Sequence, residues 1–323
     1  MPCHASSADV IMIDAARLNR SIQDFGRIGA LPQGGVCRLA LTDTEKAGRD
    51  ELVRRMQDLG LTVHIDNIGN IFGTRTGHDA DAGTIMIGSH IDTVSTGGLY
   101  DGTFGVLAGL EVIAALNDAH LETHRTITVA AFTNEEGARF QPDMLGSLVF
   151  VGGMRVQDAL DALAADGTRL GTELTRIGYA GSDEGPRNIA AYFELHIEQG
   201  PVLEAEERTI GIVTGVQGMR WYEVIVRGRS AHAGTTPMPM RKDALLAAAR
   251  MIEQVNAVAL AHAPEGLSTI GIITALPASS NVVPREVRFT VDLRHPSESV
   301  LQVMEEDFLQ RMQSCAEAND VQV

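Results

Sequence analysis

The chain has 323 residues, is 44% hydrophobic and carries a formal net charge of −16 at pH 7. That length can bury a large core and fits about two domains, while the acidic balance, without any cluster of lysines or arginines, excludes a nucleic-acid partner. Cys3, Cys37 and Cys315 are far apart and odd in number, which favours a reducing cytoplasm over a disulfide framework. The sequence shows neither a leader-like start nor about 18 uncharged apolar residues in a row, so we expect neither export nor membrane insertion.

The first predicted elements are two helices and a hairpin. Apolar residues recur at helical spacing over residues 11–25 and 44–59, and Thr42 or Thr44 is the expected N-cap of the second helix. Residues 61–75 then alternate apolar and polar side chains around the turn sequence Asn-Ile-Gly-Asn. This alternation predicts a hairpin.

Two buried strands flank a helix further along the chain. TIMIGSH predicts a strand that ends at His90, GVLAGLEVIAALND predicts a helix, and TITVAAFTNEEG predicts a strand that ends at Asn134 and Glu135. Residues 151–176 are helical in pattern, and AAYFELHIEQG predicts one more strand end. Near-continuous apolar strands joined by a helix are typical of an α/β sheet covered on both faces.

The character of the sequence changes after Gly200. The strand WYEVIVRG, the helix KDALLAAARMIEQVNAVAL, the strands STIGIITAL and EVRFTVDLR, the helix SESVLQVMEEDFLQRMQSCAEA and a short VQV follow one another. This βαββαβ order predicts a split ferredoxin-like unit. We therefore place a domain boundary near residue 214, between a domain over residues 1–214 and a second over residues 215–323.

Polar side chains follow three of the predicted strands in the first domain. They form three clusters: His90, Asp92 and Asp101; Asn134, Glu135 and Glu136; and Glu194, His196 and Glu198. Ligands of open α/β sheets bind beyond the carboxyl ends of the strands, so we expect the clusters to meet. A single histidine or acidic pair in such a place is more often structural. Three clusters together predict a metal or catalytic site.

The ligand types in these clusters indicate which metals and which chemistry to expect. Imidazole and carboxylate ligands without thiolate suit Zn²⁺, Mn²⁺, Co²⁺ or Ni²⁺, and affinity alone does not choose between them. Two such ions bridged by a carboxylate polarise a carbonyl group and lower the pKa of a bound water molecule. A carboxylate that is not a ligand then takes the proton of that water. The adjacent Glu135 and Glu136 offer one side chain for each task.

Motifs for competing chemistries are absent from the sequence. The glycines of GGLYDGTFG match neither GxGxxG nor GxxxxGK[ST], so they give little support to a nucleotide site. No GxSxG occurs, which makes a serine hydrolase a poor competitor. A hydrolytic metal centre is the function that the residues themselves favour.

The same segments resemble a known family. GSHIDTVSTGGLYDGTFGVLAG, FTNEEGARF, ELHIEQGPVLE, GIVTGVQGMRWYEVIVRGRSAHAGTTPMPMRKDA and SSNVVPREVRFTVDLRHP run through most of the chain. They are similar, in the same order, to segments of the N-carbamoyl-L-amino acid hydrolase and allantoate amidohydrolase family, the hydantoinase/carbamoylase branch of the dinuclear metallopeptidase-like amidohydrolases. The resemblance implies an α/β, zinc-peptidase-like catalytic domain with a mixed central sheet. It also implies an inserted ferredoxin-like domain that serves as lid and dimerisation surface.

Carried over position by position, the resemblance implies a centre of two divalent metal ions. His90 and His196 would bind one ion, Asp101 would bridge both ions, and Glu136 would bind the other. The metal would be Zn²⁺, Mn²⁺, Co²⁺ or Ni²⁺.

Two further carboxylates have implied roles beside the metals. Asp92 would orient His90, as carboxylates commonly orient metal-bound imidazoles. Glu135 would be the general base that activates the bridging water and then passes the proton to the leaving nitrogen. The implied reaction is hydrolysis of a ureido group, which releases ammonia and CO₂ and leaves an amino acid.

The resemblance also assigns residues to the substrate and to a partner subunit. His232 would reach the active site of the partner in a homodimer and stabilise the developing oxyanion. Asn281 and Arg294 would bind the carboxylate of the ureido substrate. Three more residues match substrate-contacting positions: Gln199, Gln217 and Arg220.

One part of the family pattern has no counterpart in this sequence. In the family, the catalytic domain resumes after the lid and supplies a further metal-binding histidine, whereas this sequence ends at Val323. We therefore expect the chain to lack the C-terminal part of the catalytic domain. We also expect the 323-residue protein to be inactive or poorly folded.

The leading interpretation is a metal-dependent hydrolase of N-carbamoyl-L-amino acids. Allantoate amidohydrolase is the close alternative, and a β-ureidopropionase or a peptidase or deacylase of the same clan is less favoured. A non-catalytic binding protein on the same fold is disfavoured, because the ligand and base residues are all present: His90, Asp101, Glu135, Glu136 and His196.

Overall fold

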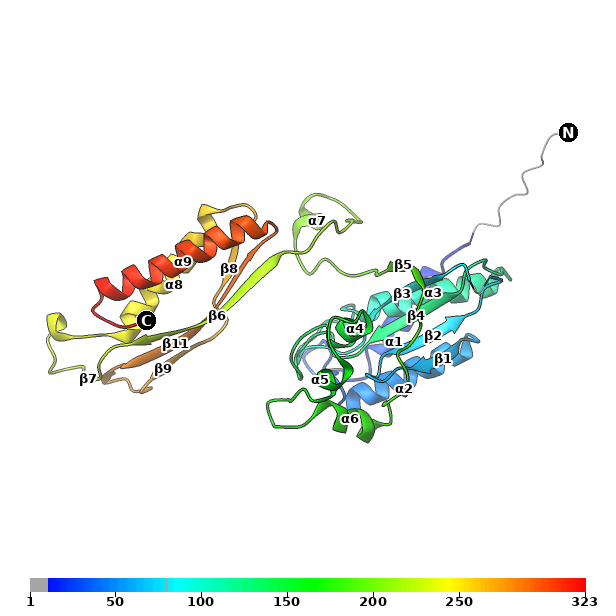
Figure 1. Ribbon diagram of the computed structural model, residues 1–323, viewed down its shortest axis with the longest axis horizontal. Coiled ribbons are helices and arrows are strands. Elements are labelled where there is room, and N and C mark those ends of the chain that lie inside the picture. The colour runs from blue at the N-terminus through cyan, green and yellow to red at the C-terminus, as the bar shows by residue number, and fades with distance from the viewer. Residues whose placement is uncertain (1–10, 80) are drawn as a thin grey trace. The chain divides into compact units, whose positions relative to one another are not determined.

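The computed structural model describes residues 11–79 and 81–323, so the predictions for Cys3 and for the start of the chain lie outside the described residues. The chain divides into two compact units, Met1–Val202 and Leu203–Val323 (Figure 1). The sequence pattern places a domain boundary later, near residue 214. The structure therefore groups the segment that precedes the first strand of the second unit with that unit.

The first unit is built on a mixed five-stranded sheet. Its strands lie in the order β1-β2-β4-β3-β5: β1 Thr62–Ile65, β2 Ile71–Arg75, β3 Thr84–His90, β4 Ile127–Phe132 and β5 Ile189–Phe193. β1 and β2 form the predicted hairpin, and β2 pairs antiparallel with β4. β3 runs parallel to both β4 and β5. The predicted α/β fold with a mixed sheet is confirmed.

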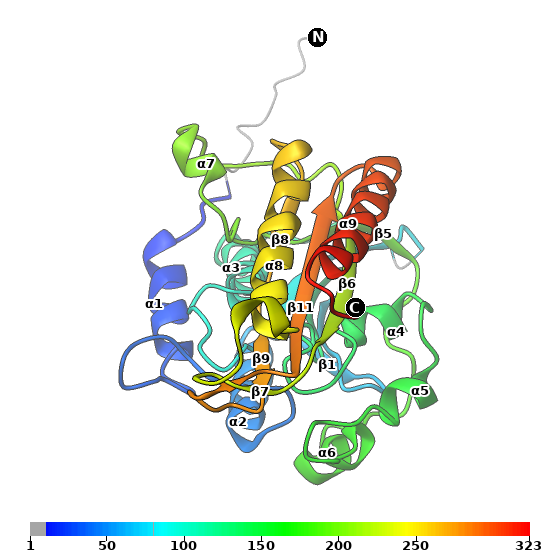
Figure 2. The same cartoon turned by 90° about the vertical axis from the view of Figure 1, so that its left-hand side faces the viewer.

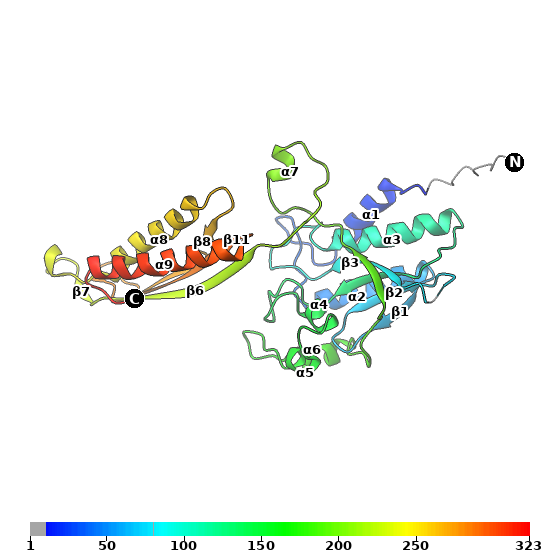
Figure 3. The ribbon, with the colours of Figure 1, turned by 45° about the horizontal axis from the view of Figure 1, so that its top comes forward.

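Three helices form the main core of the first unit with this sheet. They are α1 Ala15–Phe25, α2 Asp43–Asp58 and α3 Thr103–Asp118, and α1 lies beside α3 (Figure 3). The hydroxyl of Thr42 caps α2 by accepting a hydrogen bond from the backbone of its first turn, as the sequence predicts. Every residue of β4 is buried, because the helices cover one face and a smaller cluster around Phe72 packs on the other.

The predicted helical stretch after β4 is interrupted rather than continuous. Three short helices occupy this region: α4 Leu145–Phe150, α5 Val156–Leu160 and α6 Leu170–Ile177. Gly152 and Gly167 have φ angles of 78° and 82°. This left-handed backbone cannot continue a right-handed helix, so the apolar spacing is kept while the helix is broken.

The second unit is an antiparallel sheet with two helices on one face (Figure 2). Its main elements are β6 Gly218–Arg227, α8 Ala244–Ala261, β8 Leu267–Thr269, β9 Ile273–Leu276, β11 Glu286–His295 and α9 Glu298–Ala318. β11 is central and pairs with β6 on one side and with β8 and β9 on the other. The predicted strand STIGIITAL is thus divided in two. An isolated antiparallel bridge joins Arg227 of β6 to Gln322.

Short elements that the sequence pattern does not predict complete the chain. They are α7 Val202–Ala205, β7 Ala231–His232, the 3₁₀ turn η1 Met238–Met240 and β10 Val282–Val283. β7 and β10 pair as a two-stranded antiparallel ribbon. This ribbon carries one of the predicted site residues.

α8 is, among the described helices, the one with the length and mean hydropathy of a membrane span. Its residues Ala247, Met251, Val255 and Val258 are fully buried and recur at helical spacing on the side where α8 contacts β8 and β11. Arg250 on the same helix is exposed. A buried stripe with a charged outer face is the pattern of a core helix packed on its own sheet.

Candidate metal centre

The parallel register of β3, β4 and β5 brings three loops to one edge of the sheet. His90 at the end of β3 pairs with Phe132 at the end of β4, and Ile87 of β3 pairs with Phe193 at the end of β5. Side chains that follow parallel strands ending at one edge lie close together. The structure brings the three predicted polar clusters together at this edge.

His90, Asp101 and His196 form the centre of the cluster. One potential ligand atom from each lies within 4.8 Å of the others. Nε2 of His196 is 3.3 Å and Nε2 of His90 is 3.9 Å from Oδ1 of Asp101. Among the described residues, this is the group of histidine, cysteine and carboxylate side chains whose spacing can hold a metal ion.

Both histidines present the same ring nitrogen to this centre. Nδ1 of His90 lies 3.0 Å from the backbone carbonyl of Asp92, and Nδ1 of His196 lies 2.9 Å from that of Ile197. A carbonyl oxygen only accepts hydrogen bonds, so Nδ1 carries the proton and Nε2 keeps its lone pair when each ring is neutral. Metal-binding histidines commonly donate a hydrogen bond from the second ring nitrogen in this way.

Two glycines allow the loop after β3 to close around His90. Gly102 has a φ of 59°, and a Cβ added there would lie 2.3 Å from Nε2 of His90. A Cβ added at Gly105 would lie 2.7 Å from the backbone carbonyl oxygen of Leu195, next to His196. The start of α3 can therefore approach both histidines only where side chains are absent.

Asp92 joins the loop after β3 to the loop after β4. Its carboxylate oxygens accept hydrogen bonds from the backbone N–H groups of Glu135 and Glu136, both at 3.2 Å. The same carboxylate is 3.8 Å from Nδ1 of His90. The hydrogen bond from His90 is therefore accepted by the backbone carbonyl of Asp92, whereas the family resemblance implies that the carboxylate of Asp92 orients this ring.

Glu135 and Glu136 face the cluster with raised pKa values. Oε2 of Glu135 is 3.3 Å from Nε2 of His90, and burial raises the pKa of this carboxyl group. Burial also raises the pKa of Glu136 to about 7, and the charges of Asp101 and Asp92 add to the rise. Burial lowers the pKa of His90, but the carboxylates of Asp92 and Glu135 outweigh it and the net shift is upward. Such crowding of carboxylates favours a bound cation.

The donor set fits a divalent metal ion. Oε1 of Glu136 is buried and has no hydrogen-bond partner among the described residues. A buried carboxylate oxygen is costly unless it is paired or binds a metal. Together with the two imidazole nitrogens and Asp101, it makes a nitrogen and oxygen donor set that Zn²⁺, Mn²⁺, Co²⁺ and Ni²⁺ accept.

The third loop contributes one more contact to the centre. Nε2 of Gln199 donates a hydrogen bond of 2.7 Å to Oδ2 of Asp101, so this predicted substrate residue contacts the carboxylate of a predicted ligand. Glu194 is held by two hydroxyl groups from β3 and β5. Glu198 accepts a hydrogen bond from the first backbone N–H of α7. Of the predicted third cluster, only His196 lies in the ligand group found among the described residues.

The second unit brings two of its predicted site residues together and separates the third. His232 of β7 pairs with Val282 of β10, and the N–H of Ala233 donates to the carbonyl of Asn281 at 3.0 Å. Arg294 lies near the opposite end of β11, a strand of 10 residues that spans about 30 Å at the usual rise per residue. One copy of the unit therefore cannot apply His232, Asn281 and Arg294 to the same small molecule.

Arg220 lies at the same end of the sheet as Arg294 but on the opposite face. The strand register pairs Arg220 with the fully buried Leu293 on the face that the helices cover, whereas Arg294 lies on the other face. Arg220 accordingly donates hydrogen bonds to two carboxylates of α9. Gln217 is exposed in the segment before β6. The structure thus gives Arg220 a different partner from the substrate that the resemblance implies.

Two buried arginines beside the centre are not singled out by the sequence. Arg38 and Arg49 have exposed fractions of 0% and 2%. Arg38 donates to the carbonyl of Ile91, next to His90. Arg49 forms an ion pair with Glu45 and donates to Thr133 at the end of β4. Arginine is mostly exposed in proteins, and no local pattern distinguishes these two from surface residues.

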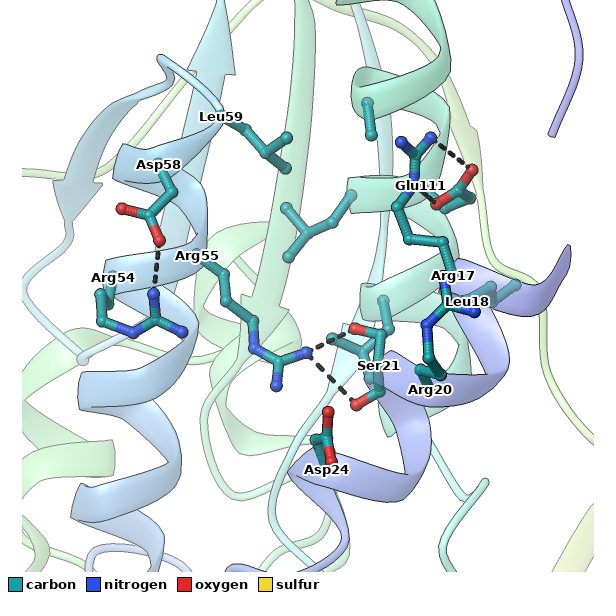
Figure 4. Close-up of a pocket in the computed structure, with 13 residues that line it drawn as sticks. Arg17, Leu18, Arg20, Ser21, Asp24, Arg54, Arg55, Asp58, Leu59 and Glu111 are labelled. Carbon is teal, nitrogen blue, oxygen red and sulfur yellow. Dashed lines mark hydrogen bonds and ion pairs between the residues drawn. The ribbon is translucent and has the colours of Figure 1, made fainter. Parts of the chain in front are cut away.

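A separate cavity lined by α1, α2 and α3 does not offer a second site (Figure 4). Arg17 in its wall is paired with Glu111, and Arg55 donates to the hydroxyl of Ser21. Arg54 is likewise paired with carboxylates of α2. Arg17, Arg54 and Arg55 already have partners within the protein, so they offer no unpaired cation to a ligand in this cavity.

Comparisons with known proteins agree with this centre. The profile of peptidase family M20/M25/M40 matches residues 86–322. The chain is 45% identical over 293 residues to an N-carbamoyl-L-amino-acid amidohydrolase from Rhizobium meliloti, covering 90% of this chain and 70% of the relative. It is 36% identical to an allantoate amidohydrolase from Bacillus subtilis (strain 168), covering 90% and 73%. A crystal structure of a hydantoinase/carbamoylase family amidase from Burkholderia ambifaria superposes with a TM-score of 0.88 at 50% identity, covering 97% and 78%.

The profile match begins within β3 and runs into the segment after α9. The matched range therefore includes the predicted site residues His90, Asp101, Glu135, Glu136 and His196. Identity at this level over most of the chain establishes common descent as well as a common fold. The chain belongs to peptidase family M20/M25/M40 and, within it, to the hydantoinase/carbamoylase amidases.

Proposed function

We propose that this protein is a metal-dependent amidohydrolase that cleaves the ureido C–N bond of N-carbamoyl-L-amino acids. The observation that carries the proposal is the convergence of His90, Asp101 and His196 beside Glu135, in a chain 45% identical to a protein of that name. One water molecule and one N-carbamoyl-L-amino acid give one L-amino acid, one CO₂ and one ammonia. The reaction is balanced without an oxidant or a second organic substrate.

The donor set supports two divalent ions in each subunit. His90 and His196 would hold one ion, Glu136 would hold the other, and Asp101 would be available to both. Zn²⁺, Mn²⁺, Co²⁺ or Ni²⁺ suits these ligands. When bound, such ions polarise the ureido carbonyl and lower the pKa of a water molecule.

Glu135 is the general base of the proposed reaction. Its carboxylate borders the centre without belonging to the ligand group. It takes a proton from the attacking water and gives it to the leaving nitrogen as the C–N bond breaks. The hydrogen bond from its backbone N–H to Asp92 sets the position from which the side chain reaches the substrate.

The second unit serves as lid and dimerisation domain in this proposal. His232 and Asn281 lie together in the β7 and β10 ribbon, and Arg294 lies at the opposite end of β11. A site that uses all three groups on one amino-acid substrate must take them from two copies, which supports a homodimer. His232 then donates a hydrogen bond to the developing oxyanion, and Asn281 and Arg294 bind the substrate carboxylate.

The proposed location is the cytoplasm. Cys37 and Cys315 are both free thiols, as is usual in a reducing compartment. Because α8 packs on its own sheet, we propose no membrane-spanning role for it.

Allantoate is the second candidate substrate. The chain is 36% identical to the allantoate amidohydrolase of Bacillus subtilis over 90% of its length, and allantoate also combines ureido groups with a carboxylate. Metal-loaded full-length protein should be assayed with allantoate, N-carbamoyl-L-amino acids, N-carbamoyl-β-alanine, N-acetyl amino acids and dipeptides. Release of ammonia only from allantoate would replace the carbamoylase assignment, and hydrolysis only of dipeptides would overturn both.

Glu135→Gln tests the proposed chemistry directly. The variant keeps the size of the side chain but cannot accept the proton, so kcat should fall by about 10²–10⁴ while bound metal remains. Glu136→Gln is the matched control, because it alters a ligand and should lower metal content as well as kcat. If Glu135→Gln kept most of its rate, another group would have to be the base.

A further inference from the structure

Arg38 spans the two ends of the loop that carries His90 and Asp101. Its Nε donates to the carbonyl of Ile91 at 3.0 Å, and its Nη2 donates to Oγ1 of Thr103 at 2.9 Å. Ile91 follows His90 directly, and Thr103 opens α3 two residues after Asp101. One guanidinium thus contacts the backbone next to one ligand and the helix start next to the other.

The other contacts of Arg38 fix the guanidinium itself. Nη1 donates to the carbonyl of Ile28 at 3.0 Å. The backbone N–H of Arg38 donates to Oγ1 of Thr93 at 2.8 Å, and its carbonyl accepts from the N–H of Thr93 at 3.0 Å. Two reciprocal hydrogen bonds between Val36 and Gly97, both 2.9 Å, continue this pairing. The segment before α2 is therefore hydrogen-bonded to the loop after β3 at several points along that loop.

The chemistry of this arginine is not that of an ordinary stabilising ion pair. Its side-chain hydrogen bonds among the described residues go to two carbonyls and a hydroxyl, although the side chain has an exposed fraction of 0%. Burying a cation on neutral acceptors costs free energy. The return is geometric, because a guanidinium fork holds three acceptors in fixed directions, which an ammonium group does not.

Arg49 provides the contrast within the same unit. Its charge is balanced by Glu45 at 2.6 Å, and it holds the end of β4 through Thr133. Removing Arg49 would leave a buried carboxylate unpaired, so its loss would damage stability first. Removing Arg38 would leave two carbonyls and a hydroxyl without their hydrogen-bond donor, and two of these groups belong to the loop, so its loss should act mainly there.

We propose that Arg38 is a positioning residue of the metal centre that fixes the separation between His90 and Asp101. It touches neither substrate nor metal, and acts by fastening the end of β3 to the start of α3. The inference rests on the proposed metal-dependent function, because the quantity that Arg38 controls is metal binding.

The test is a titration of the metal-free protein with Co²⁺, in which calorimetry measures the affinity and visible absorption reports the geometry of the site. Arg38→Met and Arg38→Lys should each weaken Co²⁺ binding by about tenfold or more and change the absorption bands, because the ligands lose their fixed spacing. Lysine should not rescue the site, since it cannot reach both Ile91 and Thr103 in the required directions. Thr103→Val, nearly equal in volume, removes one of the two loop contacts and should give a smaller change of the same kind.

Arg17→Met is the matched control for general loss of stability. Arg17 also donates to a buried partner, Glu111, with an exposed fraction of 4% (Figure 4), and its side-chain hydrogen bonds among the described residues go to Glu111 and Asp118 rather than to the loop after β3. It should lower the unfolding temperature while leaving Co²⁺ affinity and spectrum unchanged. The unfolding temperature of each variant without metal is measured alongside, so that a loss of stability is separated from a loss of positioning.

The outcomes distinguish this inference from the proposed function. If the wild-type protein binds no Co²⁺ in any stoichiometric amount, the metal-dependent function fails. If the wild type binds Co²⁺ and folded Arg38→Lys and Thr103→Val bind it with unchanged affinity and spectrum, the positioning role of Arg38 is overturned. Should Arg38→Met not fold, those two milder variants still decide the question.

Discussion

The two units of the chain arrange their candidate functional groups in opposite ways. In the first unit, β3, β4 and β5 run parallel, and the residues that follow them gather within a few ångströms around Asp101. In the second unit, the antiparallel strand β11 spreads its groups, with His232 and Asn281 near one end and Arg294 at the other. Parallel strands bring the residues that follow them to one edge of a sheet, whereas antiparallel neighbours end at opposite edges.

This difference separates two levels of organisation. The described ligands of the metal centre come from one unit of one chain, so metal binding by them depends on local geometry. The residues of the second unit that we propose bind substrate can contact one molecule together only if two copies cooperate, so their proposed role depends on assembly. The three predictions below test the first level and then the second, in decreasing order of expected effect.

Gly102→Ala should have the largest effect, because it strikes the local geometry of the centre. An added Cβ would lie 2.3 Å from Nε2 of His90, at a backbone φ of 59° that alanine rarely adopts. Metal affinity should fall by about 100-fold or more, with a lower unfolding temperature. Isothermal titration with Zn²⁺ or Co²⁺ measures the first and circular dichroism the second.

Gly98→Ala is the control in the same loop. A Cβ added at Gly98 would meet nothing within 4 Å, and the backbone of Gly98 does not have a positive φ. The variant should bind metal as the wild type does. Equal affinity in both variants would show that close packing against His90 does not govern the site.

His232→Ala tests whether the second unit acts across two copies. On its own the variant should lose about 10²–10³ in kcat, the usual effect of removing an oxyanion donor, without losing metal. Glu135→Gln is inactive for a different reason and keeps His232. Refolded or co-expressed as an equal mixture, the two should recover about a quarter of wild-type activity, because half of the dimers then contain one intact site.

Light scattering of the mixture provides the check on this complementation. A dimeric mixture that stays inactive would place His232 at the site of its own chain. A monomeric active wild type would remove the dimer from the proposal altogether.

Arg294→Lys and Arg220→Gln should differ, although both residues lie on adjacent strands at the same end of the sheet. Arg294 lies on the face away from the helices, so replacing its fork should raise KM about tenfold with little change in kcat. Arg220 is bound to carboxylates of α9, so its replacement should leave KM unchanged and slightly lower the unfolding temperature. Steady-state kinetics with one good ureido substrate are sufficient. A raised KM for Arg220→Gln would show that Arg220 also contributes to substrate binding.

Much of the metal centre can be predicted from the sequence because it follows a topological rule. His90 ends β3, and Glu135 and His196 follow β4 and β5, the two strands that run parallel to β3 on either side. The pattern also predicts the hairpin, both helices before it and the Thr42 cap, since these depend on local spacing and local hydrogen bonds.

Other features depend on contacts that a local pattern does not contain. The single helix expected over residues 151–176 is broken by backbone angles at two glycines. The ribbon that carries His232 has only two residues in each strand, too few for an alternation to be visible. Arg38 and Arg49 look like surface residues in the sequence, and their burial becomes evident only with the loops that they bind. The further histidine that the family resemblance implies stays a prediction.

The carboxylate of Asp92 accepts two hydrogen bonds from consecutive backbone N–H groups, and this arrangement has a consequence for how this protein can evolve. Because one carboxylate accepts hydrogen bonds from both Glu135 and Glu136, the proposed base and a proposed ligand share one anchor and cannot be repositioned independently. Selection for a new substrate therefore has little freedom at this edge of the sheet. Changes in specificity among relatives should accumulate where substrate groups are held separately, on the strand and ribbon of the second unit.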